Sequence, residues 1–152
     1  MKRIDIKKGQ ILQRKGEISG QVYQVVSGLL RAYSIDDKGK EHIFMFAPEG
    51  WIIADNSLPN QASQLFIDAI EHSIVISREK SISSEHNVQK LIKRISVLQN
   101  RVIMLMSASA IERYNHFVET YPNIVQRVPQ RMIASYLGIT PQALSTVKNQ
   151  RR

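Results

Sequence analysis

The sequence predicts an α+β protein in which a strand-rich N-terminal part precedes a run of helices. Two observations carry this prediction. Glycines interrupt β-rich runs from residue 1 to about residue 80, and the apolar spacing then changes from a period of two to about three and a half. The chain has 152 residues, of which 43% are hydrophobic, as is ordinary for a globular protein. We therefore expect a folded chain whose architecture changes near residue 82.

Residues 1–82 have the pattern of short strands joined by turns. The runs QVYQVV, LLRAYSI and HIFMFA are rich in β-branched and aromatic residues. IDDKGKE at 35–41 is the clearest hairpin, with Asp37, Lys38 and Gly39 in its turn. In LFIDAIEHSIVISR, the first residues alternate between the two faces of a strand. The run SIVIS follows, and we expect it to be buried on both faces of a sheet. Strands at this spacing predict a sandwich, barrel or roll.

An apolar seam marks the next segment, residues 83–108, as one long helix. The seam repeats at spacings of 3 and 4 residues, with β-branched residues at every a position and leucine at every d position, which favours a parallel two-stranded pairing. Packing against the chain's own β part is the alternative for such a stripe. The predicted dimer interface consists of Val88, Leu91, Ile95, Leu98, Val102 and Leu105.

Residues 109–152 have the pattern of a helix followed by a helix-turn-helix. The long helix should break around SASA, the next helix should end before Pro122, and Pro129 should open the last pair of helices. Gly138 falls where a tight turn needs a positive φ, and Thr140 is a good N-cap ahead of Pro141. Ala134 provides the small side chain that a close helix crossing requires. The expected core of the pair is Ile133, Leu137, Leu144 and Val147.

The positive charge lies at this end of the chain. Residues 86–152 carry ten Lys and Arg against only Glu112 and Glu119, which accounts for the whole net charge of +8. This asymmetry favours a polyanionic partner, although a solvated basic face on a purely structural helical hairpin has the same composition. We expect polar side chains of the last helix to reach base edges and basic ones to contact phosphates. The predicted contacts to double-stranded DNA are Gln130, Arg131, Thr140, Gln142, Ser145, Thr146, Lys148, Asn149, Arg151 and Arg152, with Arg127 as a further phosphate contact.

Three stretches of the sequence have a pattern typical of a known family. They are KKGQILQRKGE, VYQVVSGLLRAYSIDDKGKEHIFMFAPEGW with its Ser27-Gly28 pair, and ERYNHFVETYPNIVQRVPQRMIASYLGITPQALS. Through them, essentially the whole chain resembles the Crp/Fnr family of transcription regulators. It implies a cyclic-nucleotide-binding-like β-roll of the jelly-roll type at 1–82, a dimerisation helix at 83–108 and a helix-turn-helix DNA-binding domain at 109–152. The partners that it implies are DNA, a second copy of the chain, RNA polymerase and a small-molecule effector.

The effector pocket departs from the pattern of this family. Members that bind cyclic nucleotides carry a Gly-Glu pair and then an arginine for the cyclic phosphate. The matching stretches here hold Ile53, Ala54 and Asp55 and then residues 61–64, with no arginine. An unpaired phosphate beside Asp55 in a dry pocket would be unfavourable, so we expect no binding of cyclic AMP. Thr146 also stands where relatives tend to carry arginine, and the chain begins almost directly on its first strand.

No cofactor or catalytic centre is expected. The chain has no cysteine, which excludes disulfides and an iron–sulfur cluster held by cysteines. Its four histidines, His42, His72, His86 and His116, are scattered, whereas a haem or a cupin-like metal site would need ligands brought together. Neither a nucleophile elbow nor a Gly-rich phosphate loop is present.

These features lead to one main functional hypothesis and one alternative. We expect a homodimeric, sequence-specific DNA-binding transcription regulator with a degenerate effector pocket that does not take cyclic AMP. The alternative is a dimeric module that has lost sequence-specific DNA binding and modulates partner proteins. No stretch approaches the roughly 18 apolar residues of a membrane span, so we expect a cytoplasmic protein with no membrane partner.

Overall fold

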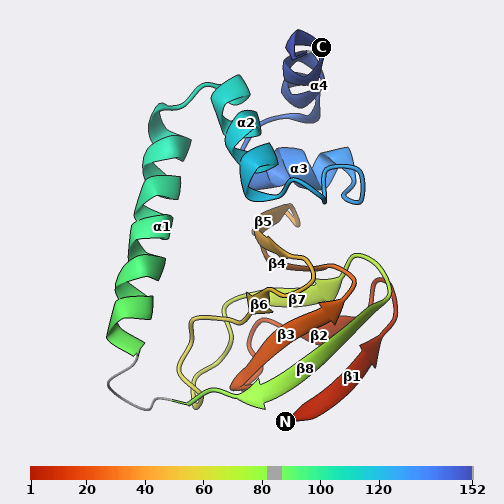
Figure 1. The fold of residues 1–152 in the computed structure, drawn as a ribbon, viewed down its shortest axis with the longest axis vertical. Coiled ribbons are helices and arrows are strands. Elements are labelled where there is room, and N and C mark those ends of the chain that lie inside the picture. The colour runs from red at the N-terminus through yellow and green to blue at the C-terminus, as the bar shows by residue number, and fades with distance from the viewer. Residues whose placement is uncertain (82–86, 152) are drawn as a thin grey trace. The chain divides into compact units, whose positions relative to one another are not determined.

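The computed structural model describes residues 1–81 and 87–151, which form two compact units, Met1–Lys80 and Ser81–Arg152 (Figure 1). Within the described residues the first unit holds eight strands and the second holds four helices. The α+β class predicted from the sequence is therefore confirmed. The domain boundary predicted between residues 82 and 83 lies outside the described residues, as do His86 and Arg152, and that boundary stays a prediction.

The first unit is a jelly-roll-like pair of antiparallel four-stranded sheets. One sheet has the order β1-β8-β3-β6 and the other the order β2-β7-β4-β5. The strands are β1 (Lys2–Ile6), β2 (Ile11–Gln13), β3 (Gln21–Ser27), β4 (Leu30–Ile35), β5 (Glu41–Ala47), β6 (Ile52–Ile53), β7 (Phe66–Ala69) and β8 (Ser73–Glu79).

The core of this unit is formed by one face of each sheet. Val25 of β3 lies opposite Val75 of β8 in the first sheet, and Ala32 of β4 lies opposite Ile67 of β7 in the second. Side chains alternate along each strand, so every second residue joins the core. The buried cluster is Ile6, Tyr23, Val25, Leu30, Ala32, Met45, Ala47, Ile53, Ile67, Ala69 and Val75.

The predicted hairpin joins β4 to β5. Ile35 pairs with Glu41, and Gly39 adopts a φ of 77° between them, as a turn at this position requires. The carboxylate that closes the turn belongs to Asp36, which accepts hydrogen bonds from the backbone nitrogens of Lys38 and Lys40, both at 2.9 Å. The turn lies at Asp37, Lys38 and Gly39, as the sequence predicted, and the sequence did not single out Asp36 as its acceptor.

The expectation that SIVIS is buried on both faces is wrong. Strand β8 lies between β1 and β3, yet its burial alternates: Ser73, Val75 and Ser77 are buried, whereas Ile74 and Ile76 are only partly covered. A strand in the middle of a sheet has hydrogen-bonded neighbours on both sides. Only its face toward the second sheet is buried. An apolar run alone therefore did not distinguish a half-buried strand from a fully buried one.

Gly28 permits the tight connection between β3 and β4. Its φ is +91°, and a Cβ built on it would lie 2.3 Å from Ser73 Oγ and 2.5 Å from the carbonyl oxygen of His72. Ser73 Oγ also accepts a hydrogen bond from the backbone nitrogen of Leu29 at 3.1 Å, so the neighbouring chain is fixed against the turn. Only glycine fits here without displacing backbone atoms.

We expect Gly28→Ala to lower the free energy of unfolding of the β unit by about 3 kcal/mol or more, because positive-φ strain adds to steric overlap. Gly39→Ala is the matched control, since its φ is +77° but a Cβ there would meet nothing within 4 Å. The control should cost only the strain, about 1 kcal/mol. Urea unfolding followed by the fluorescence of Trp51, the one tryptophan of the chain, measures both variants. Equal losses would contradict the steric explanation.

The second unit begins with a long helix and continues with three shorter ones. They are α1 (Asn87–Ser107), α2 (Ala110–Thr120), α3 (Gln130–Leu137) and α4 (Pro141–Gln150). The predicted break at SASA is confirmed. Ser109 is the N-cap of α2 and forms a capping box with Glu112, whose carboxylate accepts from the backbone nitrogen of Ser109 at 2.7 Å. Helix α2 ends just ahead of Pro122, as predicted. None of these described helices has both the length and the hydropathy that a bilayer crossing requires.

Candidate functional site

The two C-terminal helices form a compact pair around a defined turn. Helix α3 ends at Gly138, which has a φ of 66° and donates its backbone N–H to the carbonyl of Ser135. Thr140 then starts α4: its hydroxyl oxygen accepts from the backbone nitrogen of Ala143 at 3.1 Å, and Pro141 occupies the first turn. The local signals at Gly138, Thr140 and Pro141 thus produce the turn that the sequence predicted.

The buried side of the pair holds the residues expected there. Ile133, Leu137 and Leu144 are completely buried, and Ala134 and Val147 are nearly so. The ring of Tyr136 packs on those of Phe117 and Tyr121, with centroid distances of 5.4 Å and 5.7 Å. The helix pair is thereby fixed onto α2 and the segment that follows it.

The opposite side of the pair is polar and exposed. Of the predicted DNA contacts, Lys148 is half-buried, and Arg127, the further phosphate contact, is likewise half-buried. Two hydroxyls are already engaged: that of Thr140 caps α4, and that of Thr146 donates to the carbonyl of Gln142 at 3.2 Å. The predicted contacts that are exposed are Gln130, Arg131, Thr140, Gln142, Ser145, Thr146, Asn149 and Arg151.

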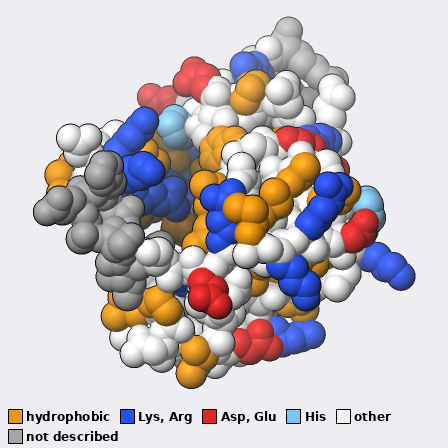
Figure 2. Space-filling model, turned by 60° about the horizontal axis from the view of Figure 1, so that its bottom comes forward, with side chains coloured by type: hydrophobic (Ala, Val, Ile, Leu, Met, Phe, Trp, Pro, Cys, Tyr) orange, Lys and Arg blue, Asp and Glu red, His pale blue; other side chains and the backbone are white. Residues whose placement is uncertain are grey.

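The sequence of the helical unit is rich in basic residues, and this composition supports a polyanionic partner. On the face seen in Figure 2, Lys and Arg side chains lie dispersed among hydrophobic ones. The case for a polyanionic partner therefore rests on the excess of basic residues in 86–152.

Arg113, which the sequence did not single out, joins the ends of two helices. Its guanidinium donates to the carbonyls of Leu105 at 2.7 Å and Ala108 at 3.0 Å, at the end of α1, and to that of Leu137 at 3.2 Å, at the end of α3. Terminal helix carbonyls lack intrahelical donors, so one side chain supplies partners to both ends. No spacing in the sequence signals this contact.

Arg101 of α1 makes a second connection to α3. Its guanidinium carbon lies 4.0 Å from the ring centroid of Tyr136, and its Nη2 donates to the carbonyl of Tyr136 at 3.3 Å. In the structure this arginine orients the helix pair relative to α1, together with Arg113.

We expect Arg113→Lys to lower the free energy of unfolding of the helical unit by about 2 kcal/mol, because one ammonium group cannot reproduce three forked hydrogen bonds. Arg131→Ala, which removes an exposed arginine, should stay within about 0.5 kcal/mol of the parent. Thermal and urea unfolding followed by far-UV circular dichroism measures both. Indistinguishable stabilities of the two variants would show that the Arg113 contacts do not hold the helix ends.

The other helices of the second unit leave most of the apolar seam of α1 uncovered. Val88, Leu91, Ile95 and Val102 are between 55% and 62% exposed. Leu98 and Leu105 are half-buried. Further apolar residues, Ile92, Val97, Ile103 and Met106, are exposed on the same helix, so its apolar surface is wider than the predicted seam. The exposed seam is therefore a candidate interaction site.

The loop from residue 54 to residue 65 corresponds to the predicted effector region and lies between β6 and β7. Asp55 is only 3% exposed. Its Oδ1 accepts from the backbone nitrogen of Ser57 at 2.7 Å, and its Oδ2 accepts from those of Gln64 and Leu65, both at 2.7 Å. Burial acts to raise the pKa of this carboxyl, but the hydrogen bonds from Ser57, Leu65 and Gln64 outweigh burial and hold the pKa below its ordinary value.

Arg31 of β4 is a buried cation that the sequence did not mark. Its Nε and Nη2 donate to the two carboxylate oxygens of Asp68 at 2.8 Å and 2.9 Å, and its guanidinium also pairs with Glu41. Burial acts to lower the pKa of Arg31, but the bonds to Asp68 and Glu41 outweigh burial and raise it. This arginine is bound within the second sheet and does not belong to the loop at 54–65.

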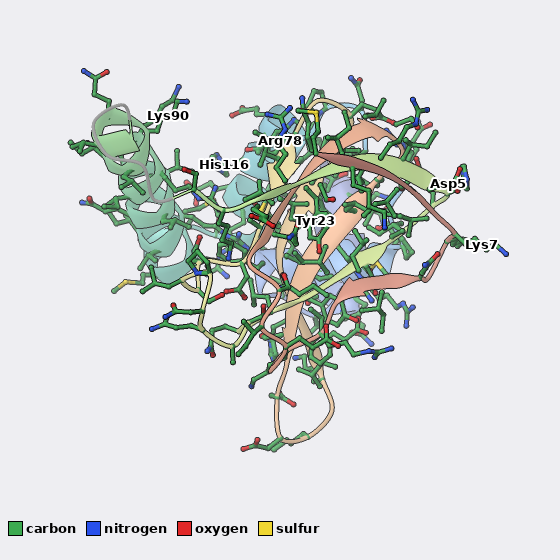
Figure 3. The ribbon with its side chains drawn as sticks, turned by 90° about the horizontal axis from the view of Figure 1, so that it is seen from below. Asp5, Lys7, Tyr23, Arg78, Lys90 and His116 are labelled. Carbon is green, nitrogen blue, oxygen red and sulfur yellow. The ribbon has the colours of Figure 1, made fainter. Side chains whose placement is uncertain are left out.

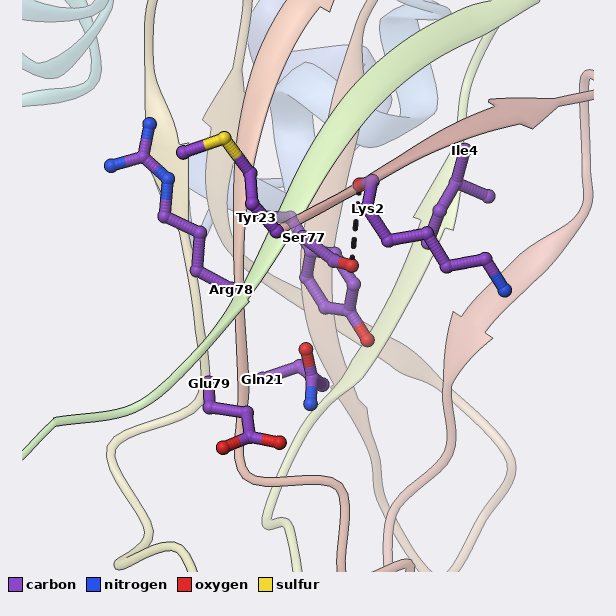
Figure 4. Close-up of a pocket in the computed structure, with 8 residues that line it drawn as sticks. Lys2, Ile4, Gln21, Tyr23, Ser77, Arg78 and Glu79 are labelled. Carbon is purple, nitrogen blue, oxygen red and sulfur yellow. Dashed lines mark hydrogen bonds between the residues drawn. The ribbon is translucent and has the colours of Figure 1, made fainter.

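A hollow of about 770 Å³ lies on the first sheet (Figure 4). Its lining mixes apolar and polar groups, and Ser77 Oγ donates to the carbonyl of Lys2 at 3.4 Å across one side of it. Burial raises the pKa of Tyr23, and a hydrogen bond with Ser19 opposes that rise. The lining residues are Met1, Lys2, Ile4, Gln21, Tyr23, Ser77, Arg78 and Glu79.

The described histidines do not gather at one place. His42 pairs with Asp36 at 2.9 Å, His72 pairs with Asp5 at 2.8 Å, and His116 lies on α2 (Figure 3). Among residues 1–81 and 87–151, no group of three or more His, Cys, Asp or Glu side chains is placed to hold a metal ion.

Comparison with known proteins finds regulators. The chain is 23% identical to regulatory protein HlyX of Actinobacillus pleuropneumoniae and 26% identical to the fumarate and nitrate reduction regulatory protein of Yersinia pestis, over 92% of its length in both cases. It spans 67% and 64% of the lengths of these two relatives. Its fold matches that of FixK2 from Bradyrhizobium japonicum with a TM-score of 0.78, at 20% identity, covering 98% of this chain and 83% of that one. A Crp/Fnr family regulator from Thermus thermophilus gives a TM-score of 0.73 at 15% identity, with coverages of 98% and 84%.

The strand-rich unit defines the class of the protein. Residues 3–81, more than half of the chain, match the family model of the cyclic nucleotide-binding domain, and the chain belongs to that family. With the helical unit that follows and the regulators to which it is similar, it is a member of the Crp/Fnr family of transcription regulators. The family membership predicted from the sequence is confirmed, and the relatives to which the chain is similar are regulators.

Proposed function

We propose that the protein is a homodimeric, sequence-specific DNA-binding transcription regulator. The observation that carries this proposal is the division of α4 into two sides. Leu144 and Val147 are buried against the rest of the unit, while Gln142, Ser145 and Asn149 are exposed. A helix that is fixed on one side and polar on the other, with a defined start at Thr140, suits insertion into a major groove.

Two kinds of contact are expected from this helix pair. Gln142 and Asn149 carry amides that can pair with adenine through two hydrogen bonds, and Ser145 can donate or accept. Arg131 at the start of α3 and Lys148 and Arg151 at the end of α4 are suited to phosphates, which position the protein without reading sequence. Selection from random duplexes at near-physiological salt should therefore recover a two-fold symmetric motif.

We expect Gln142→Ala and Arg131→Ala to fail in different ways. Gln142→Ala should lose about 1–3 kcal/mol of discrimination at one position of each half-site. Arg131→Ala should weaken all sequences alike and reduce the slope of log K against log salt by about 0.9 for each phosphate that is no longer neutralised. Lys7→Ala, at an exposed lysine of the β unit, is the control and should change neither. Fluorescence anisotropy over a salt series measures the binding of each variant to DNA. Unchanged specificity and an unchanged slope in both variants would contradict this interface.

The exposed seam of α1 supports the homodimer. A second copy would bury Val88, Leu91, Ile95, Leu98, Val102 and Leu105 along about 26 Å of helix, at 1.5 Å per residue. It would also place two copies of α4 about a two-fold axis, as a palindromic site requires. The seam thus supports both the oligomeric state and the geometry of DNA recognition.

We expect Ile95→Asp to convert the dimer to a monomer and to abolish high-affinity DNA binding, because a carboxylate would be buried without a partner. Ile103→Asp is the matched control: Ile103 is 52% exposed on the same helix but lies outside the seam, and Ile95 is 62% exposed. Sedimentation velocity measures the state of each variant. Dissociation by both variants, or by Ile103→Asp alone, would place the interface elsewhere.

One observation favours the alternative function, a dimeric module that modulates partner proteins. The hydroxyl of Thr146 is bonded to its own helix at Gln142, in a position where relatives tend to carry arginine. Unenriched sequence from the selection, together with an intact dimer, would support this alternative. RNA polymerase stays a predicted partner of the main function.

The residues of loop 54–65 do not fit a cyclic nucleotide. The loop contains no Lys or Arg to pair with a cyclic phosphate, and two of its backbone N–H groups, at Gln64 and Leu65, already bind Asp55. We therefore propose that cyclic AMP is not the effector. The hollow of Figure 4, at about 770 Å³, has the volume of a small-molecule site and is where we expect an effector of another kind.

A further inference from the structure

The carboxylate of Asp55 accepts hydrogen bonds from backbone groups at both ends of its loop. It is almost completely buried, and it accepts from three backbone N–H donors, each at 2.7 Å, and also from the side chain of Ser57. A buried charge is costly unless hydrogen bonds replace its hydration. Short bonds from three amides supply that replacement, and such converging amides make a concave site that favours an anion.

The same three bonds connect the two ends of the loop. Oδ1 binds the nitrogen of Ser57 near the start of the loop, and Oδ2 binds the nitrogens of Gln64 and Leu65 near its end. Lys80 adds a tie from outside, since its Nζ donates to the carbonyl of Ser57 at 2.8 Å. Ser63 fixes the loop from another side, since its carbonyl accepts from the backbone nitrogen of Gly16 and its own nitrogen donates to the carbonyl of Glu17, both at 2.8 Å. Asp55 thus joins the two ends of a segment that other contacts also hold.

We propose that Asp55 is a built-in anion, which occupies the amide cluster of Ser57, Gln64 and Leu65 and holds loop 54–65 closed without an external ligand. The amide cluster suits a carboxylate, a small anion with two oxygens on one carbon. The chain supplies this carboxylate itself, from Asp55. A cyclic phosphate finds these donors taken. The inference deepens the proposal that cyclic AMP is not the effector, because it names the group that occupies these donors.

Removal of the carboxylate should expose a site that an external carboxylate can fill. We expect Asp55→Ala to lower the Tm of the β unit by on the order of 10 °C, because three amides lose their acceptor. Sodium formate should then restore several degrees of the loss relative to sodium chloride at the same ionic strength, since a ligand that binds only the folded form raises Tm. The parent protein should show no difference between the two salts.

Asp36→Ala is the matched control. Asp36 also accepts from two backbone nitrogens, those of Lys38 and Lys40, but it lies exposed in the hairpin, where water replaces the lost acceptor. This variant should lose little stability and show no response specific to formate. An equal formate effect in all three proteins, or an Asp55→Ala protein as stable as the parent, would overturn the proposal.

A second variant covers the case in which Asp55→Ala does not fold. In Asp55→Asn one acceptor oxygen stays, and an NH₂ group faces the remaining amides. Amide hydrogen exchange at Ser57, Gln64 and Leu65 should then accelerate at least about tenfold, the equivalent of about 1.4 kcal/mol. Unchanged protection at these amides would overturn the proposal. Neither measurement involves DNA or a nucleotide. A failure of the Asp55 proposal can therefore be distinguished from a failure of the proposed function.

Discussion

The direction of the C-terminal helix pair depends on how the guanidinium of Arg113 satisfies the ends of two helices. The carbonyls of Leu105 and Ala108 at the end of α1 and of Leu137 at the end of α3 accept from this one planar group. Because the donors of an arginine have a fixed geometry, the two helix ends cannot move independently without breaking bonds. The turn at Gly138 then passes that orientation on to α4.

This constraint links the predicted dimer interface to the predicted DNA interface within one unit. The seam of α1 would set the two-fold axis, and Arg101 and Arg113 set the position of α3 relative to α1. The separation of two copies of α4 would therefore depend on residues that touch neither the DNA nor the second copy. A change at Arg101 or Arg113 would alter the preferred spacing of half-sites and leave the bases read within each half-site unchanged.

Features with a local signature could be predicted from the sequence, and features formed by distant residues could not. Gly138, Thr140 and the break before α2 follow from turn and capping chemistry within a few residues, and the structure has them as expected. The pairs formed by Arg31 and Asp68, and by Arg113 and Leu137, join residues 37 and 24 positions apart, so no spacing signalled them. Asp55 was recognised as a charge in the effector region, but its amide partners depend on how the loop returns to β7. The error at SIVIS has the same origin, because the cover of a sheet's outer face is not encoded in the strand.

The charges inside the β unit also restrict how such a domain can respond to a ligand. Arg31 is neutralised by Asp68 and Glu41, and Asp55 by three backbone amides. Among the described residues, no buried side-chain nitrogen or oxygen lacks a hydrogen-bond partner. A ligand shifts a conformational equilibrium only by the difference between its affinities for the two states. With the amides of the loop filled by Asp55, an anionic ligand gains little there in either state, so regulation through this loop would require Asp55 to leave first. If Asp55 holds the loop as proposed, the β unit is better suited to keep a fixed conformation than to sense a cyclic phosphate, and small-molecule control would act through another surface, such as the hollow beside Tyr23.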